Sequence, residues 1–303
     1  MPELPEIETV KIQLHKRLVG QTLVSVEALH PKSVEGNLSL VKGKKIIGVK
    51  RYGKMLLVNI EGDLGIAIHF KMTGELVLVR SSQIAVRSKN SISDRIAGGH
   101  PTTDWVSELP SKHTRAIFHF VSGDTMYFND QRIFGWVKIM RDEEVEKLPF
   151  IEKLGPEPWN MTDEAFYSRF KHRKRAVKLV LMDQELLSGI GNIYANDGLW
   201  EAKIHPATSA QTISQKQAAV LKEAIIQVLE EGIKYGGASA ADAKYVNLDG
   251  LGGTYQKHFR VYDREGNKCL RRDGGIIKKY TLGGRGTYYC PVCQKKPKTV
   301  RTH

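Results

Sequence analysis

The sequence predicts an α+β protein of more than one domain, with a β-sandwich or barrel behind a leading helix, a helical domain, and a C-terminal hairpin that binds metal. Three observations predict this. Short β-type runs separated by turn residues fill positions 22–140. The apolar spacing becomes helical after Pro158. The three cysteines fall near the C-terminus, between Cys269 and Cys293. A chain of 303 residues is long enough for two domains of ordinary size.

The first expected element is an amphipathic helix over residues 3–19. Its apolar residues recur at spacings of three and four, and Gly20 follows as a stop (Ile7, Val10, Leu14, Leu18). Strands are expected next, at Leu23–Leu29, Lys45–Val49, Met55–Ile60, Gly65–Phe70, Glu75–Val79, Arg115–Val121, Thr125–Asn129 and Gly135–Met140. The segment 81–112 has little periodicity, and we interpret it as a long surface loop or insertion.

The second half of the chain has helical spacing after a rigid connector at Leu154–Pro158. Ser214–Gln217 fits a capping box, and an apolar stripe follows up to Gly236 and Gly237 (Leu221, Ala224, Ile225, Val228, Leu229). We expect a loop at 238–256 and then hairpin strands that include Phe259–Tyr262 and Gly286–Tyr289. The predicted domains are therefore 1–150, 151–257 and 258–303.

Composition limits the class of protein and points to a polyanionic partner. No apolar run reaches 18 residues and no secretory leader is evident, so we expect a cytoplasmic protein that is not a membrane protein. Three cysteines cannot form a disulfide framework. The net charge is +13, and residues 256–303 alone carry thirteen Lys and Arg against three acidic residues. A solvated basic tail is one explanation; nucleic-acid binding is the other, and cysteines and aromatic residues in the same segment favour it.

The N-terminus carries a possible nucleophile. Removal of Met1 would leave Pro2 with a free secondary amine, and an α-amino group titrates near pH ~8 in model peptides. Attack of this amine on a sugar C1′ gives a cationic iminium, and Glu3 could then transfer protons. The same residues are also natural at a helix start, because Pro suits the first turn and Glu favours the positive end of the dipole.

Two further motifs suit ligand binding. In Gly189–Ala195 a Gly-x-Gly turn precedes a helix, so backbone N–H groups and Asn192 could contact a phosphate, although a tight turn without ligand has the same pattern. The pattern Cys269-x3-Asp273-x16-Cys290-x2-Cys293 predicts a zinc ribbon with aspartate as a hard fourth ligand. A hairpin that packs without metal is the alternative.

Together these motifs resemble the formamidopyrimidine-DNA glycosylases, bacterial base-excision enzymes that remove oxidised purines such as 8-oxoguanine. The opening Met1–Val10 matches that family's N-terminus almost residue for residue, and other matches recur in order along the chain (Leu154–Pro158, Met182–Gln184, Gly189–Ala195, Leu282–Thr287). The resemblance covers the chain except about 81–112. It implies a helix-two-turns-helix architecture for the helical domain and duplex DNA bound in the cleft between domains.

The resemblance also implies roles for individual residues. Pro2 corresponds to the nucleophile that forms a Schiff base with C1′, Glu3 to the acid/base residue, and Lys54 to a lysine that contacts phosphate beside the lesion. The other correspondences are to DNA-binding positions: Met72 fills the space of the flipped base, Arg132 and Phe134 face the orphaned cytosine and wedge the stack, and Lys178, Asn192 and Arg285 bind phosphates. The loop 238–256 would close over the extruded base.

The implied protein is a monomeric bifunctional DNA glycosylase and AP lyase that needs no organic cofactor and carries one Zn²⁺. Three features depart from the family: Asp273 replaces a cysteine, Asp197 stands where glutamate is usual, and 81–112 is extra. One alternative is an endonuclease VIII type for oxidised pyrimidines, which Met72, Arg132 and Phe134 together disfavour. A catalytically silent DNA-binding relative is the other, which intact Pro2, Glu3 and Lys54 disfavour.

Overall fold

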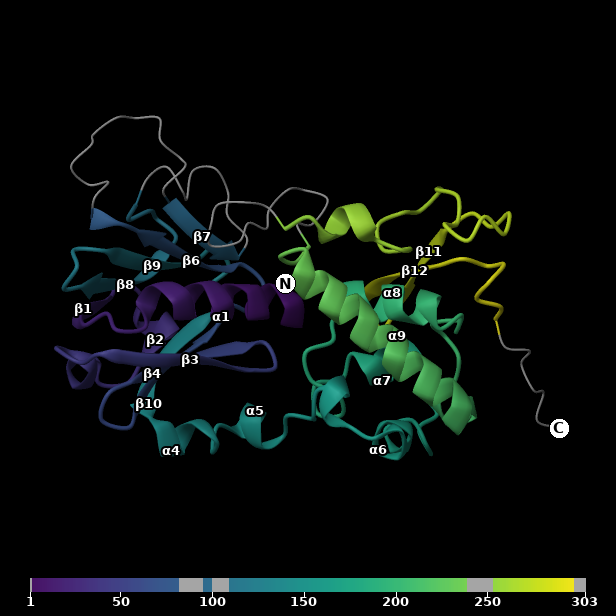
Figure 1. Cartoon of the computed structure of the whole chain (residues 1–303), viewed down its shortest axis with the longest axis horizontal. Helices are drawn as coiled ribbons and strands as arrows, with labels where there is room; N and C mark the ends of the chain where they lie inside the picture. The colour runs from purple at the N-terminus through teal and green to yellow at the C-terminus, as the bar shows by residue number, and fades with distance from the viewer. Residues whose placement is uncertain (1, 82–94, 100–108, 239–252, 297–303) are drawn as a thin grey trace. The chain divides into compact units, whose positions relative to one another are not determined.

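The computed structural model describes residues 2–81, 95–99, 109–238 and 253–296 (Figure 1). It divides into two compact units. The first comprises Met1–Glu152 with Gly232–Gln256, and the second comprises Lys153–Glu231 with Lys257–His303. The chain thus leaves its first unit, builds most of the second, returns, and ends in the second.

The first unit is a sandwich of two five-stranded sheets preceded by helix α1 (Leu4–Leu18). One sheet has the order β1-β8-β9-β6-β7 and the other β2-β10-β5-β4-β3. All pairings are antiparallel except β2 with β10. The strands are β1 (Leu23–Ala28), β2 (Val34–Glu35), β3 (Ile46–Tyr52), β4 (Met55–Ile60), β5 (Leu64–His69), β6 (Gly74–Val79), β7 (Arg95–Gly99), β8 (Thr114–Phe120), β9 (Thr125–Asp130) and β10 (Trp136–Arg141).

The predicted leading helix forms because its apolar stripe completes the sandwich core. Ile7, Val10, Leu14 and Leu18 are buried in one cluster with residues of both sheets, and Figure 1 shows α1 alongside those sheets. Burying such side chains stabilises a fold by about 1.5–3 kcal/mol each. The helix is therefore fixed to the sandwich along its whole length, and its first residues are held with it.

The second sheet is buried on both faces at β4, which explains why this strand is apolar at every position except Asn59. Leu56, Val58 and Ile60 point into the main core, whereas Met55 and Leu57 belong to a second cluster on the outer face. Side chains near the short helices α4 (Asp142–Val145) and α5 (Pro149–Glu152) cover that face (Val145, Leu148, Phe150, Ile151). A strand buried on both faces has no reason to alternate polar and apolar residues.

The predicted strands are present within one residue at each end, except that β3 continues three residues beyond the predicted end at Val49. The interpretation of 81–112 as loop is wrong for Arg95–Gly99. This segment is strand β7, which pairs with β6 through Val77↔Ala97. Two glycines and an arginine in five residues give no β pattern, so the pairing partner rather than the local sequence makes the strand. Residues 82–94 and 100–108 lie outside the described part.

The second unit contains helices and a hairpin. Its helices are α6 (Asp163–Ser168), α7 (Val177–Leu181), α8 (Asn192–Glu201) and α9 (Gln215–Lys234), whose last residues pass into the first unit. The predicted capping box is present, because Gln217 N–H donates to Ser214 Oγ at 3.2 Å and Ser214 N–H donates to Gln217 Oε1 at 3.0 Å. Short 3₁₀ turns occur at Pro31–Ser33, Leu38–Val41, Pro158–Asn160, Ala210–Thr212 and Tyr255–His258.

The hairpin of this unit pairs β11 (Lys278–Leu282) with β12 (Arg285–Tyr289), and the prediction of a strand at Phe259–Tyr262 is wrong. The backbone N–H groups of Val261 and Tyr262 each donate to Asp197 Oδ1 at 3.0 Å. A buried carboxylate on α8 therefore takes the donors that a neighbouring strand would have used. Asp197, which stands where the resembling family usually has glutamate, therefore has a structural role: it orders the backbone at Val261 and Tyr262.

Within the described residues, no helix combines the length and the apolar character that a bilayer crossing requires.

The buried Asp197 carboxylate gives a stability prediction. Burial raises its pKa, and the backbone N–H groups oppose that rise. We expect Asp197→Ala to lower the free energy of unfolding by about 3 kcal/mol, because two buried donors lose their acceptor. Asp197→Asn keeps one acceptor oxygen without a buried charge and should cost clearly less. Urea unfolding of both variants at pH 7 measures this; equal losses would contradict the assignment.

Candidate functional site

The N-terminal residues are buried and held by two carboxylates. Pro2 is buried, and Glu3, which is 3% exposed, is the N-cap of α1. Glu3 and Glu6 form a capping box in which Glu3 N–H donates to Glu6 Oε2 at 2.7 Å. The other oxygen, Glu6 Oε1, accepts from Ala238 N–H at 2.8 Å. Glu6 thus fixes the backbone beside Pro2 and also the first residue of the 238–256 segment.

Lys54 lies at the turn between β3 and β4 and is nearly buried. The turn is tied to α1 because Arg51 donates to Gly53 O at 3.0 Å and to Glu8 Oε2 at 2.7 Å. Burial, with the nearby charges of Lys71 and Lys54, lowers the pKa of His69 to about 3. His69 Nδ1 accepts from Lys71 N–H at 3.0 Å, so the neutral imidazole carries its proton on Nε2.

Met72, Arg132 and Phe134 come together from two loops of the first unit. Arg132 Nη1 lies 3.4 Å from Met72 Sδ, and the Arg132 guanidinium lies 5.0 Å from the centre of the Phe134 ring. Phe134 is 52% exposed, so an aromatic ring and a guanidinium project from the sandwich side by side. Between them Ile133 has φ 57°, a left-handed conformation that is costly for a β-branched residue.

Asp130 organises both of these loops, and the sequence analysis did not single it out. Its Oδ2 accepts from Gly135 N–H at 2.6 Å, and its Oδ1 accepts from Arg132 N–H at 3.2 Å and from the Thr73 hydroxyl. Thr73 Oγ1 in turn accepts from Arg132 N–H at 3.0 Å. Asp130 is completely buried. Its carboxylate therefore fixes the loop that carries Met72 and the 131–135 loop relative to each other.

The three residues of the second unit that were predicted to bind phosphate, Lys178, Asn192 and Arg285, lie on elements that hydrogen bonds connect. Asn192 begins α8, and Arg285 is exposed at the start of β12. Asn196 bonds α8 to β12 by accepting from Tyr288 N–H at 2.8 Å. Lys178 is fully buried and donates to Gly286 O at 2.9 Å and Thr287 Oγ1 at 2.8 Å. In this structure Lys178 therefore holds the strand that presents Arg285.

The four predicted metal ligands form a cluster. One ligand atom from each of Cys269, Asp273, Cys290 and Cys293 lies within 4.8 Å of all the others. The Cys269 and Cys293 sulfurs are 4.0 Å apart, close to the roughly 3.8 Å of two thiolates on one tetrahedral zinc. A Cβ on Gly275 would lie 2.3 Å from Cys290 Sγ, so the backbone approaches closer than any side chain allows. The donor set and its spacing fit a structural Zn²⁺.

Side chains that contact the sulfurs join the cluster to α8. Trp200 Nε1 lies 3.4 Å from Cys269 Sγ, and Arg271 Nη1 lies 3.5 Å from Cys293 Sγ and also donates to Trp200 O at 2.7 Å. Gly275 N–H lowers the pKa of Asp273, whereas burial raises the pKa of Cys293 to about 12. The cysteine pKa means that zinc binding near neutral pH must release protons.

Comparison with known proteins agrees with this arrangement. The model of the formamidopyrimidine-DNA glycosylase N-terminal domain matches residues 1–137, and that of the family's H2TH domain matches 154–244. The zinc finger found in FPG and IleRS matches 266–296. The formamidopyrimidine-DNA glycosylase of Pelotomaculum thermopropionicum is 36% identical over 302 residues, which cover 97% of this chain and 99% of that protein. The chain belongs to the formamidopyrimidine-DNA glycosylase family.

Solved structures of the family have the same fold. The MutM (Fpg) protein of Thermus thermophilus matches with a TM-score of 0.81 and 33% identity, over 98% of this chain and all of that one. The Lactococcus lactis Fpg in complex with abasic-site DNA matches with a TM-score of 0.80 and 31% identity, over 97% and 100%. The predicted α+β fold class, with its helix-two-turns-helix domain and zinc-ribbon hairpin, is thereby confirmed.

Sequence reasoning missed Glu6, His69 and Asp130. Glu6 stood in the opening motif, but nothing in the sequence shows that its carboxylate reaches Ala238, which lies 232 residues away. Asp130 sits in an ordinary turn pattern, and only the folded loops show what it binds. The predicted 238–256 loop lies outside the described residues except at its two ends.

The zinc site gives a prediction about its fourth ligand. Asp273→Cys should tighten zinc binding, because a thiolate is softer than a carboxylate, and Gly275→Ala should lose zinc because its Cβ collides with Cys290. Glu265→Gln, an exposed acid in the same segment, is the matched control. Competition with a chromophoric chelator gives the affinities; unchanged zinc affinity for Asp273→Cys would show that Asp273 is not a ligand.

Proposed function

We propose that this chain is a bifunctional DNA glycosylase and AP lyase that excises oxidised purines, such as 8-oxoguanine and formamidopyrimidines, from duplex DNA. One observation carries the proposal: a buried Pro2–Glu3 pair at the head of a helix fixed in the sandwich, in a chain of this family. The net charge of +13 suits a polyanionic substrate. The substrate would be chromosomal DNA in the nucleoid.

The proposed chemistry begins at the Pro2 nitrogen. Its lone pair forms a bond to C1′ as the glycosidic bond breaks. The base leaves with the electron pair of the glycosidic bond and takes up the proton that the Pro2 ammonium releases. Glu3 protonates O4′, the sugar ring opens, and an iminium joins Pro2 to C1′. The iminium acidifies the adjacent C–H, so loss of a proton expels the 3′ phosphate, and a second elimination expels the 5′ phosphate. Hydrolysis of the iminium frees the Pro2 amine.

The remaining site residues are proposed to hold and distort the DNA. Extrusion of a nucleotide costs a few kcal/mol of stacking and pairing. Met72 would fill the vacated space, with Phe134 as wedge and Arg132 facing the orphaned cytosine. Lys54, Asn192 and Arg285 would bind phosphates, and Lys178 would act through the strand it supports. In this scheme domain 1–150 supplies the chemistry, while domains 151–257 and 258–303 grip the backbone.

Covalent trapping tests the nucleophile. Cyanoborohydride should reduce the imine and leave a stable conjugate with an abasic-site duplex, but not when Met1 is retained, because acylation removes the lone pair. Glu6→Gln should trap more slowly, because Glu6 uses one oxygen for each N–H and glutamine replaces one of these acceptors with an NH₂ donor. Glu61→Gln, an exposed acid, should behave as wild type. Trapping by the Met1-retaining protein would refute the proposal.

The proposed wedge predicts that substitutions at Phe134 and Arg132 lower the rate of base release but have little effect on cleavage of an abasic site. Phe134→Ala and Arg132→Ala should slow base release from an 8-oxoguanine·C duplex roughly 10- to 100-fold, because less energy is available for extrusion. Cleavage of a preformed abasic site should change much less. Val121→Ala removes another exposed apolar group elsewhere on the sandwich and is the control. Faster excision from a thymine-glycol·A duplex than from 8-oxoguanine·C would favour the endonuclease VIII type instead.

A further inference from the structure

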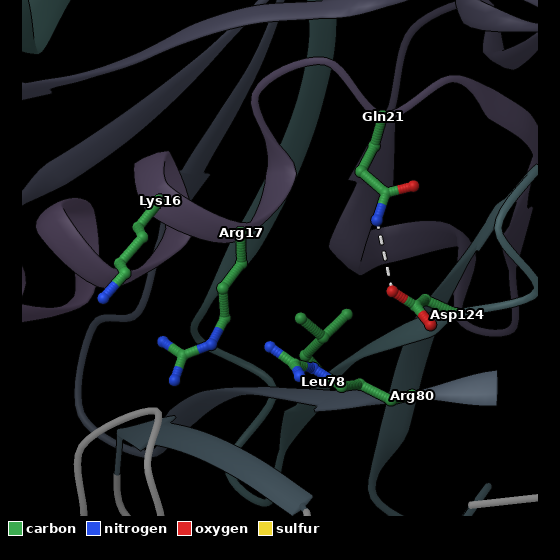
Figure 2. Close-up of a pocket in the computed structure, with 6 residues that line it drawn as sticks. All are labelled: Lys16, Arg17, Gln21, Leu78, Arg80 and Asp124. Atoms are coloured by element: carbon green, nitrogen blue, oxygen red, sulfur yellow. Dashed lines mark hydrogen bonds between the residues drawn. The ribbon is translucent and has the colours of Figure 1, made fainter. Parts of the chain in front are cut away.

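A basic pocket lies in the first unit, apart from the residues discussed above. Its volume is about 400 Å³, and it is lined by Lys16, Arg17, Gln21, Leu78, Arg80 and Asp124 (Figure 2). A pocket of this size lies within the range that small-molecule sites occupy. Lys16 and Arg17 come from the last turn of α1, Arg80 follows β6, and Asp124 precedes β9.

Basic side chains outnumber acidic ones in the lining of this pocket. Lys16, Arg17 and Arg80 line it together with one carboxylate, Asp124, which already accepts two hydrogen bonds. Asp124 Oδ1 accepts from Ser81 N–H at 2.9 Å, and Oδ2 accepts from Gln21 Nε2 at 3.2 Å. Among the residues that the structure describes, no carboxylate oxygen lies within 4.0 Å of the Lys16 ammonium or the Arg80 guanidinium.

The helix dipole explains only part of this charge. Cations in the last turn of a helix are favoured by its negative end, which accounts for Lys16 and Arg17. Arg80 belongs to no helix, yet Figure 2 shows its guanidinium turned into the same space as that of Arg17. Arg80 therefore adds a positive charge that no helix end compensates, and an anion in this space would be attracted to it.

The pocket is separate from the proposed chemistry. It lies at the far end of α1 from Pro2, and at 1.5 Å per residue that helix spans about 20 Å. None of its lining residues belongs to the nucleophile, the wedge or the metal cluster. The pocket therefore has no part in the reaction scheme above.

We propose that this pocket is a phosphate-binding site. Two guanidinium groups and an ammonium present a fork of N–H donors that matches phosphoryl oxygens, and the Gln21 amide adds a polar group at the wall. The phosphate can come from a small polyphosphate such as pyrophosphate or from the backbone of a long duplex. The inference does not rest on glycosylase activity.

Calorimetric titration of the zinc-loaded full chain with pyrophosphate is the first test. The double variant Lys16→Gln/Arg80→Gln should weaken binding at least about tenfold, since two charge-assisted contacts are lost. Asp124→Asn should tighten binding severalfold because the one repelling charge is removed; a merely misfolded variant would not bind more tightly. Lys45→Gln/Lys50→Gln changes the net charge equally on exposed residues outside the pocket and is the matched control.

A second arm distinguishes the source of the phosphate. Anisotropy titrations compare duplexes of about 12 and about 30 base pairs, which span about 40 and about 100 Å at 3.4 Å per base pair. If pyrophosphate binds Asp124→Asn more tightly and Lys16→Gln/Arg80→Gln more weakly than it binds wild type, the site is assigned to small polyphosphates. Loss of affinity by the double variant on the long duplex alone assigns it to the DNA backbone. If the pocket variants match the control in both arms, the proposal is overturned.

Discussion

The proposed chemistry depends on one constraint, which is that Pro2 and Glu3 must be immobile before substrate binds. A terminal amine normally belongs to the most mobile part of a protein. Here helix α1 begins at Leu4, its apolar stripe is buried in the sandwich core, and the Glu6 carboxylate binds the backbone N–H of Glu3. Ordering a residue costs about 1–2 kcal/mol, and the burial of α1 supplies that stabilisation before any substrate binds.

Buried carboxylates that bind backbone N–H groups recur in this basic protein. Glu6 joins the N-cap to Ala238, Asp130 joins two exposed loops, and Asp197 holds the segment at Val261 and Tyr262. An anion that accepts several N–H bonds orders irregular backbone without needing a neighbouring strand. Among the described residues, most lysines and arginines are not buried (Lys54, Arg115 and Lys178 are), while a few buried acids order the interior.

Periodicity and spacing predicted what depends on local sequence. The leading helix, the sandwich strands and the capping box at Ser214 follow from apolar patterns, and the Cys269–Cys293 spacing predicted a cluster that the fold assembles. Strand β7 was missed because its partner β6, not its composition, makes it a strand. The roles of Glu6, Asp130 and Asp197 were beyond the sequence, since each acts on backbone that only the fold brings near.

Peptide mapping of the reduced conjugate is the most direct test of the central claim. After trapping on abasic DNA and nuclease digestion, trypsin should release the peptide Pro2–Lys11 with its mass increased by a sugar remnant. Fragmentation should place the remnant on the Pro2 nitrogen. A remnant on any lysine, with Pro2–Lys11 recovered unmodified, would contradict the account and transfer the nucleophile's role to that side chain.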